Sequence, residues 1–353
     1  MSSVRQIAAE AGVSPATVSR ILNNDPDVDE GTRARVLGIA NRQGYAPKIG
    51  RRVNSILGIA LPSTLSRDLG SFDGAIVYGA SNGCRDEGHR IAIVDLASDK
   101  RPSESFTHFA SRCGLRALVL RRLPGLDRTL DELARERFPH VVIADRFERP
   151  EIAWIDTDSF SPSEQAVRHL LELGHRRIAV GHYARGGADA ADRVAGYRKA
   201  HEDADIKIDD ALVIEMGALL DDGARLVDYA LSMPDPPTAL YVTHSMPSIG
   251  ALRRLQQRGV RVPGEFSLVG FDDCDSRVMT HPMLTVVRQD SYDMAYRAVR
   301  WLIRSFDEPD GAPMRETVSG MFEVNLTTSI APDVPIRVLP DGRIAIQERT
   351  SDS

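Results

Sequence analysis

The chain has 353 residues, of which 42% are hydrophobic and 27% are charged, and its formal net charge is −6. This composition is typical of a globular protein of two or three domains, and no apolar run reaches the length that a membrane span needs. Three widely spaced cysteines (Cys84, Cys113 and Cys274) give neither a disulfide framework nor a metal pattern, so we expect a cytoplasmic protein without metal or cofactor.

The charge is distributed unevenly along the chain. Residues 1–54 carry eight basic and five acidic side chains, whereas the remainder carries 36 basic and 45 acidic ones. A small basic N-terminal part on a large acidic body indicates that only the N-terminal part is suited to meet phosphate groups.

Residues 3–43 predict three short helices. Ser3, Ser14 and Asp29 each stand at a position where a side-chain oxygen can cap a following helix. Gly12 suits the left-handed residue that ends the first helix. Two short helices joined by a turn that contains glycine form a helix-turn-helix.

The second of these helices is expected to enter a DNA major groove by its N-terminal turn. Arg20 can place its guanidinium fork on a guanine edge, while small side chains and the helix N-terminus meet thymine methyls and phosphates. The residues predicted to contact DNA are Arg5, Ser14, Pro15, Ala16, Thr17, Ser19, Arg20 and Asn23. The alternative is a three-helix bundle that contacts another protein.

After residues 1–46, we expect a short basic linker over 47–55 and a body over 56–332. In the body, short β-branched runs alternate with helix-length amphipathic segments, which predicts parallel sheets covered by helices on both faces, arranged as two doubly wound lobes. The predicted strands are 56–62, 91–96, 117–120, 140–145, 152–156, 177–183, 211–215, 238–243, 267–272 and 284–287.

Residues 333–353 form a C-terminal tail. Apolar and polar residues alternate on both sides of Pro-Asp-Gly in IRVLPDGRIAIQE (336–348), which predicts a β-hairpin, although a disordered tail is the alternative. No heptad repeat is present, so a coiled-coil tail is not expected.

Several segments resemble the lactose/galactose-repressor (LacI/GalR) family of bacterial transcription regulators. VRQIAAEAGVSPATVSRILNN resembles the family's headpiece, and HLLELGHRRIAVG (169–181), DRVAGY (192–197), SLVGFDD (267–273) and LTVVRQD (284–290) resemble its body motifs in the same order. The resemblance implies a periplasmic-binding-protein-like body with an effector between its lobes. It also implies a homodimer that binds a palindromic operator in double-stranded DNA.

The same resemblance implies effector-binding residues. Arg193 matches the family's effector arginine and Asp272 the first aspartate of its G-F/Y-D-D motif, so together they would bracket the hydroxyls of a sugar or polyol. The alternatives are a surface salt bridge for Arg193 and a helix cap or turn for Asp272.

Other positions depart from the family pattern. His244 stands where Asn is common, and Ser291 where an aromatic residue often covers the sugar ring. We still expect His244 and Ser291 at the effector, together with Asp158, which precedes the H-L segment, and Ser63, which follows the first strand. A core or capping histidine is the alternative for His244.

The linker is the largest departure from the family. It reads KIGRRVNS, shorter than usual and without a central leucine, which argues against a hinge helix. Arg51 and Arg52 could lie along DNA phosphates or in a narrow minor groove. A plain basic tether is the alternative.

The sequence therefore predicts a ligand-responsive transcriptional regulator, expected to be a repressor, that does not cross a membrane. A sugar-binding module with a protein-contacting headpiece and a carbohydrate-active enzyme of the same body fold are the alternatives. No nucleophile with a base beside it is apparent, which argues against the enzyme.

Overall fold

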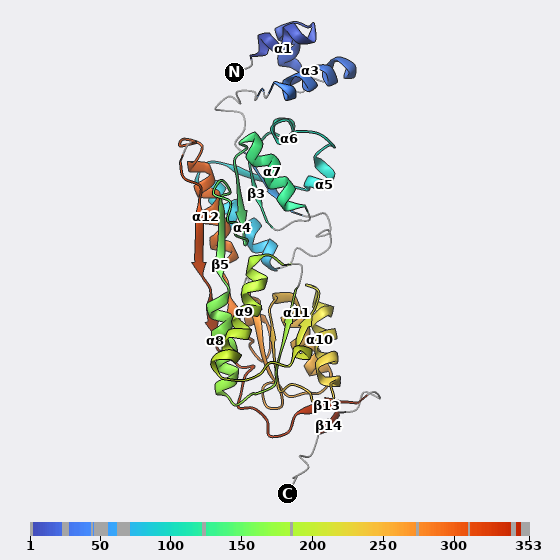
Figure 1. Cartoon of the computed structure of the whole chain (residues 1–353), viewed down its shortest axis with the longest axis vertical. Coiled ribbons are helices and arrows are strands. Elements are labelled where there is room, and N and C mark those ends of the chain that lie inside the picture. The colour runs from blue at the N-terminus through green and yellow to red at the C-terminus, as the bar shows by residue number, and fades with distance from the viewer. Residues whose placement is uncertain are drawn as a thin grey trace.

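The computed structural model describes residues 3–22, 28–43, 45, 56–61, 71–121, 125–183, 186–272, 275–309, 311–339 and 344–346. A helical headpiece lies at one end of the long axis, two lobes follow it, and a small hairpin lies at the other end (Figure 1). The structure thus has the predicted fold class, an α/β protein with an N-terminal helix-turn-helix and a two-lobed, doubly wound body. No helix in these ranges is long and apolar enough to cross a bilayer.

The headpiece consists of α1 (Val4–Ala11), α2 (Pro15–Leu22) and α3 (Glu30–Arg42). As expected, Asp29 caps α3, because its Oδ2 accepts a hydrogen bond of 2.9 Å from the Thr32 amide. The three helices bury one shared apolar core: Ile7, Ala8, Ala11, Val18, Ile21, Val36, Ile39 and Ala40.

The other predicted caps of the headpiece are also present. Ser3 and Gln6 form a reciprocal capping box at the start of α1. Gly12 ends α1 with a φ of 66°, a left-handed conformation that glycine adopts without strain. The Ser14 hydroxyl accepts a hydrogen bond of 3.0 Å from the Thr17 amide and so caps α2. These caps fix the turn between α1 and α2.

The N-terminal lobe is built on an all-parallel sheet with the order β11-β5-β4-β3-β1-β2. Helices α4 and α12 cover one face, and α6 and α7 cover the other. The elements are β1 (Ile56–Ala60), α4 (Ser71–Asp86), β2 (Arg90–Val94), α5 (Leu96–Asp99), α6 (Phe106–Cys113), β3 (Leu115–Leu120), α7 (Leu126–Glu136), β4 (His140–Ile143), β5 (Trp154–Asp158), α12 (Ser291–Arg304) and β11 (Arg315–Ser319).

The C-terminal lobe has a sheet with the order β12-β10-β9-β8-β6-β7, in which only β12 is antiparallel. Helices α8 and α9 cover one face, and α10 and α11 the other. The elements are α8 (Phe160–Glu172), β6 (Ile178–His182), α9 (Ala188–Asp203), a 3-10 turn η2 (Asp210–Leu212), β7 (Val213–Glu215), α10 (Leu220–Ser232), β8 (Ala239–Val242), α11 (Ser245–Gln257), β9 (Ser267–Asp272), a 3-10 turn η3 (Ser276–Met279), β10 (Thr285–Arg288) and β12 (Met321–Glu323).

All ten predicted strands form, with bounds that differ from the prediction by two residues at most. The predicted C-terminal hairpin is present as well, because β13 (Ile336–Val338) pairs antiparallel with β14 (Ile344–Ile346). Ile336 and Val338 are buried in the core beneath α10. The strands β11 and β12 were not predicted.

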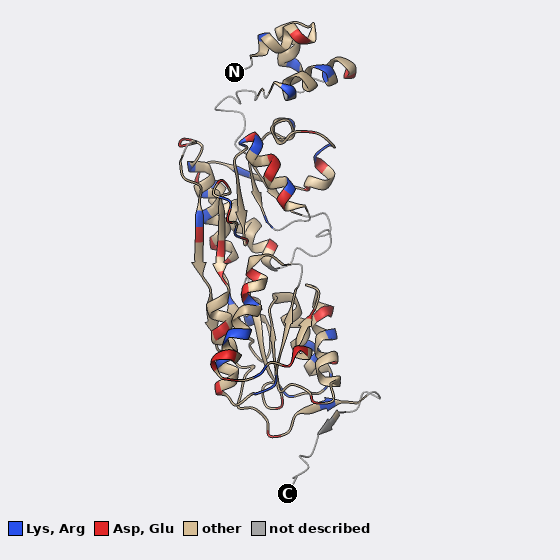
Figure 2. Cartoon of the chain, viewed as in Figure 1, with Lys and Arg blue, Asp and Glu red and all other residues tan. Residues whose placement is uncertain are grey.

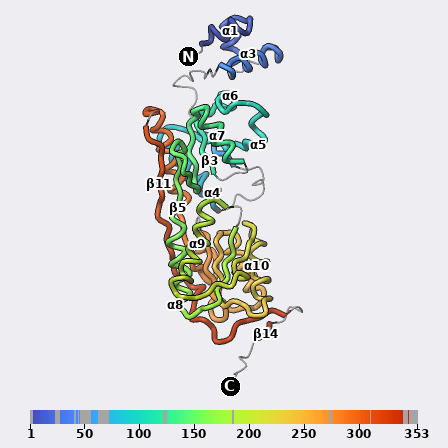
Figure 3. Tube along the Cα trace, in the orientation of Figure 1, coloured from blue at the N-terminus to red at the C-terminus, as the bar shows by residue number. Residues whose placement is uncertain are grey.

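The chain passes between the lobes three times, from β5 to α8, from β10 to α12 and from β11 to β12. Figure 3 shows β5 and β11 running side by side toward the second lobe. Gly320 lies in the third crossover, where a Cβ atom would come within 2.6 Å of the Asp158 carbonyl oxygen. Glycine therefore allows the first and third crossovers to pack closely.

Candidate DNA-binding and effector-binding sites

The outer face of α2 carries most of the residues expected to meet DNA. Val18 and Ile21 are buried against the other two helices, which leaves the opposite face of α2 for contacts. Of the expected residues, those that are exposed are Arg5, Ser14, Pro15, Ala16, Ser19 and Arg20, while Thr17 is half-buried. Asn23, Arg51 and Arg52 lie outside the described residues.

The N-terminus of α2 is capped by hydroxyl groups. The Ser14 and Thr17 hydroxyl oxygens lie 2.8 Å apart, beside the first amides of the helix. This end carries the positive pole of the helix dipole and suits a phosphate oxygen. Arg20, one turn further, presents a side chain that can read a guanine edge. Figure 2 shows both basic and acidic residues on the headpiece helices, as it does over the two lobes.

Arg193 lies in α9 and is only 2% exposed. Its Nη1 donates to the Thr243 carbonyl oxygen at 2.6 Å, its Nη2 donates to Asp189 at 2.6 Å, and its Cζ lies 3.8 Å from the centre of the Phe271 ring. Its Nε has no hydrogen-bond partner among the described residues. Arg193 is therefore a buried cation at the carboxyl ends of β8 and β9 and not part of a surface salt bridge.

Asp272 is the last residue of β9 and is fully buried. Its Oδ1 accepts hydrogen bonds from the Ser276 amide and hydroxyl at 2.9 and 2.6 Å, and its Oδ2 accepts one from Arg277 at 2.9 Å. The carboxylate thus holds η3 in place, and its predicted contact with an effector stays a prediction.

His244 immediately precedes α11 and is half-buried. Its Nδ1 lies 3.1 Å from the Thr243 hydroxyl, and its ring stands edge-on to Tyr183 with centroids 5.5 Å apart. Burial and the positive charge of Arg193 hold the pKa of His244 well below its usual range. The imidazole is therefore neutral near pH 7 and can both donate and accept a hydrogen bond.

The remaining expected effector residues are placed differently. Asp158 caps α8, because its Oδ1 accepts hydrogen bonds of 3.0 Å from the Phe160 and Ser161 amides, and the expected effector contact stays a prediction. Ser291 begins α12 and is fully buried. Ser63 lies outside the described residues.

Two consecutive residues that follow β4 join the lobes. The Arg146 guanidinium bridges both carboxylate oxygens of Asp192 in α9, with one contact of 2.8 Å, and also lies 3.3 Å from Asp156 in β5. Asp145 accepts a hydrogen bond of 3.1 Å from the Ala188 amide at the N-terminus of α9. We call the set Asp145, Arg146, Asp156, Asp189, Asp192 and Arg193 the interlobe cluster.

Asp156 is the fully buried carboxylate of the interlobe cluster. Burial, reinforced by the negative charges of Asp189 and Asp145, raises the pKa of Asp156 to about 7. A hydrogen bond of 2.8 Å from the Thr157 amide and the nearby Arg146 act in the opposite direction. The cluster therefore carries more negative charge than its two arginines neutralise.

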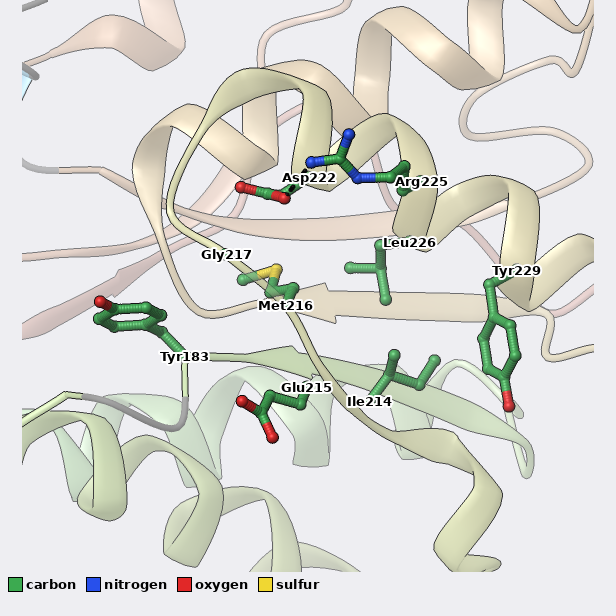
Figure 4. Close-up of a pocket in the computed structure, with 9 residues that line it drawn as sticks. All are labelled: Tyr183, Ile214, Glu215, Met216, Gly217, Asp222, Arg225, Leu226 and Tyr229. Atoms are coloured by element: carbon green, nitrogen blue, oxygen red, sulfur yellow. Dashed lines mark hydrogen bonds and ion pairs between the residues drawn. The ribbon is translucent and has the colours of Figure 1, made fainter.

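A pocket of about 650 Å³ lies in the C-terminal lobe, along β7 and α10 (Figure 4). Ile214, Met216 and Leu226 form its apolar part, and Tyr183 and Tyr229 stand at opposite ends. Because the Tyr183 ring also contacts His244, the pocket borders the expected effector residues.

Two family models match the chain in the order that the structure shows. The model of bacterial regulatory proteins of the lacI family matches residues 3–48, and the model of the periplasmic binding protein-like domain matches residues 167–324. The chain belongs to the LacI family of bacterial regulatory proteins. As a LacI-family member, it has a DNA-binding headpiece in front of a periplasmic-binding-protein-like body.

Relatives of this LacI-family chain match it over most of their length. The transcriptional repressor PurR of Haemophilus influenzae strain PittEE is 25% identical over 313 residues, which cover 88% of this chain and 93% of PurR. The transcriptional repressor CytR of Escherichia coli strain K12 is 27% identical over 315 residues, which cover 86% of this chain and 89% of CytR. These relatives are transcriptional repressors, so the chain is a transcription regulator and not an enzyme.

Solved structures of LacI-family regulators have the same architecture. The complex of the transcriptional regulator CelR with cellobiose aligns with a TM-score of 0.65 at 26% identity and covers 93% of this chain and 100% of CelR. A LacI-family regulator from Enterococcus faecium with bound ribose aligns with a TM-score of 0.68 at 18% identity, covering 78% of this chain and 100% of that one. At this identity the second comparison supports the fold alone.

The sequence did not identify most residues of the interlobe cluster as site residues. The majority of these residues belong to the N-terminal lobe of this LacI-family body. Asp145 and Arg146 lie two and three residues after the end of β4, and Asp156 lies within the neighbouring strand β5. The carboxyl ends of parallel strands meet at one edge of a sheet, where ligands bind in open α/β folds. The polar residues that follow the apolar runs HVVI and IAWI could therefore have been identified from the sequence as candidate site residues.

Proposed function

We propose that the chain is a transcriptional repressor whose headpiece binds operator DNA and whose body binds a small hydroxylated effector, such as a sugar, between the lobes. The observation that carries the proposal is that the N-terminal turn of α2 and Arg20 are exposed. They precede a two-lobed body whose lobes are in contact through polar residues. The family and its repressor relatives support it. We place the protein in the cytoplasm, where the operator is.

The effector would lie against Arg193, His244 and Asp272 of the C-terminal lobe. All three stand at the carboxyl ends of neighbouring strands or directly beside them, where open α/β sheets bind ligands. The buried Nε of Arg193 lacks a partner in the described residues, and a ligand oxygen would satisfy it. Asp272 would act by fixing η3 beside the ligand.

A homodimer would present two headpieces to a palindromic operator with half-sites about one helical turn apart. Exposed apolar side chains in the C-terminal lobe support self-association, since Met279 is 83% exposed and Val278 and Leu326 are 58% and 57% exposed. Val278 and Met279 lie in η3. A hydrogen bond of 2.8 Å from Arg277 to Glu323 joins η3 to the edge strand β12.

The proposal is tested by selecting bound sequences from random duplex DNA and titrating them by fluorescence anisotropy over a range of salt concentrations. We expect an affinity that falls steeply with salt, because phosphate contacts release counterions. A panel of sugars, polyols and nucleosides is then added, and one member is expected to change operator affinity by about 5–150-fold. A headpiece that contacts protein would show no salt-dependent, sequence-selective DNA binding.

Arg20→Ala is expected to weaken operator binding by about 1–3 kcal/mol and to relax the preference at one base position, because the bidentate contact to a base is lost. Arg128→Ala, in the body, removes a side chain that is 88% exposed and should leave binding unchanged. If Arg20→Ala and Arg128→Ala give the same affinity and preference, α2 is not the recognition helix.

A further inference from the structure

The interlobe cluster contains four carboxylates and two guanidinium groups. Asp145 and Asp156 are buried, at 1% and 0% exposure, and Asp189 and Asp192 are partly buried on the first two turns of α9. Arg146 and Arg193 are the cations of this cluster. The excess of acidic groups also affects Asp156, because the charges of Asp189 and Asp145 contribute to raising its pKa.

Both arginines of the cluster are already engaged by protein oxygens. Arg193 uses its two terminal nitrogens for Asp189 and the Thr243 carbonyl group. Arg146 uses its fork for Asp192 and reaches Asp156 with the same side chain. Phosphate and carboxylate ligands are normally bound by an open guanidinium fork, and here carboxylates of the protein occupy that role.

We propose that the site between the lobes selects a neutral or cationic hydroxylated effector and rejects phosphorylated or carboxylated molecules, with Asp189 and Asp192 as the specificity-determining residues. This inference rests on the proposed effector site and adds the chemical class of its ligand. An anion would have to approach four carboxylates in a partly dehydrated region, where like charges repel strongly. A hydroxyl or ammonium group instead donates hydrogen bonds to carboxylate oxygens.

The unpartnered Nε of Arg193 is consistent with such a ligand. It offers one N–H donor, which suits a single hydroxyl or ring oxygen, whereas a phosphate would need the two terminal nitrogens that Asp189 and Thr243 hold. The site therefore combines one free donor with several acceptors, a pattern that complements a polyol.

The test compares two double variants with the same change of charge. Asp189→Asn with Asp192→Asn removes the carboxylate partners that α9 provides for Arg193 and Arg146, and Asp156 stays beside Arg146. Asp203→Asn with Asp205→Asn makes the same change at the exposed C-terminal end of α9. Binding of inorganic phosphate, ribose and the phosphate ester of ribose is measured by isothermal titration calorimetry on the full chain.

We expect the wild-type protein and the Asp203/Asp205 variant to bind neither inorganic phosphate nor the phosphate ester. The Asp189/Asp192 variant should bind phosphate at least about tenfold tighter than both, because two nearby negative charges are gone and Arg193 and Arg146 have lost their carboxylate partners in α9. If the double variant does not fold, Asp189→Asn and Asp203→Asn provide the same comparison.

The proposal is overturned if the wild-type protein binds inorganic phosphate or the phosphate ester measurably, or if the two variants bind phosphate equally. A failure of the proposed function gives a different result, since then no small molecule changes operator affinity in the anisotropy assay. The comparison of the two variants with phosphate does not depend on that outcome.

Discussion

Among single residues, Asp156 of the interlobe cluster makes the free energy of unfolding depend on pH. Its pKa in the folded protein is about 7, above the ordinary value of 3.8, so the folded state retains a proton that the unfolded state releases between these values. The free energy of unfolding contributed by Asp156 therefore decreases as pH rises from about 4 to about 7, by about 1.4 kcal/mol for each pKa unit of difference.

Asp156→Asn should remove this dependence, because the amide stays neutral at every pH. We expect the stability of the variant relative to wild type to increase as pH rises through this window, as measured by urea denaturation at a series of pH values. Asp131→Asn removes an exposed carboxylate of the same lobe and is the control for the change of charge. Parallel profiles for wild type and Asp156→Asn would contradict the assignment.

At the scale of elements, the contact between α4 and α12 depends on glycine. A Cβ atom at Gly79 would overlap the carbonyl oxygen of Tyr292 in α12, whereas one at Gly74, in the same helix, meets nothing within 4 Å. Gly79→Ala should lower the free energy of unfolding by about 1–3 kcal/mol through overpacking. Gly74→Ala should raise it by about 0.5–1 kcal/mol through helix propensity. Chemical denaturation of both variants measures this difference, and equal effects would contradict it.

The C-terminal hairpin is a second element whose contribution can be measured. Ile336 in β13 is 4% exposed beneath α10, while Ile330, only a few residues earlier, is 78% exposed. Ile336→Ala should cost about 2–5 kcal/mol of unfolding free energy, because it leaves a cavity in the core. Ile330→Ala should change it by less than about 0.5 kcal/mol. Equal stability of the two variants would show that the hairpin does not pack as described.

For the molecule as a whole, Arg146 is a cation that joins the two lobes, since it pairs with Asp156 in one lobe and Asp192 in the other. Arg146→Ala leaves the cluster with four carboxylates and one guanidinium group, so we expect the lobes to separate and the radius of gyration from small-angle X-ray scattering to increase. Arg149→Ala, in the same loop, removes ion pairs to Asp131 and Glu151 within one lobe and should leave the radius unchanged. Identical scattering from Arg146→Ala and wild type would rule out this role.

Much of this architecture could be predicted from the sequence, because ten of the body's strands are apolar runs between amphipathic helices. The strands β11 and β12 escaped prediction because they are edge strands, in which polar and charged residues such as Arg315 and Glu316 interrupt the apolar pattern. The order of strands in each sheet is set by tertiary pairing, which local patterns do not encode.

The candidate site was predicted in part. Arg193 was recognised from a motif, but its partner Asp189 and the cross-lobe residues Asp145 and Arg146 were not, because single charged residues after a strand look like ordinary loop residues. At Asp158, a motif position predicted an effector contact, whereas the hydrogen bonds of its Oδ1 to the first backbone amides of α8 could not be predicted from that motif.

The three crossovers also constrain how the chain folds during synthesis. The N-terminal lobe takes its strand β11 and its helix α12 from residues that come after almost the whole C-terminal lobe in the sequence. Because α12 supplies Met294, Ala298 and Val299 to the core, a nascent chain that ends before them exposes the apolar face of the first sheet. The lobe made first on the ribosome is therefore completed late, and chaperones have a long interval in which to bind it.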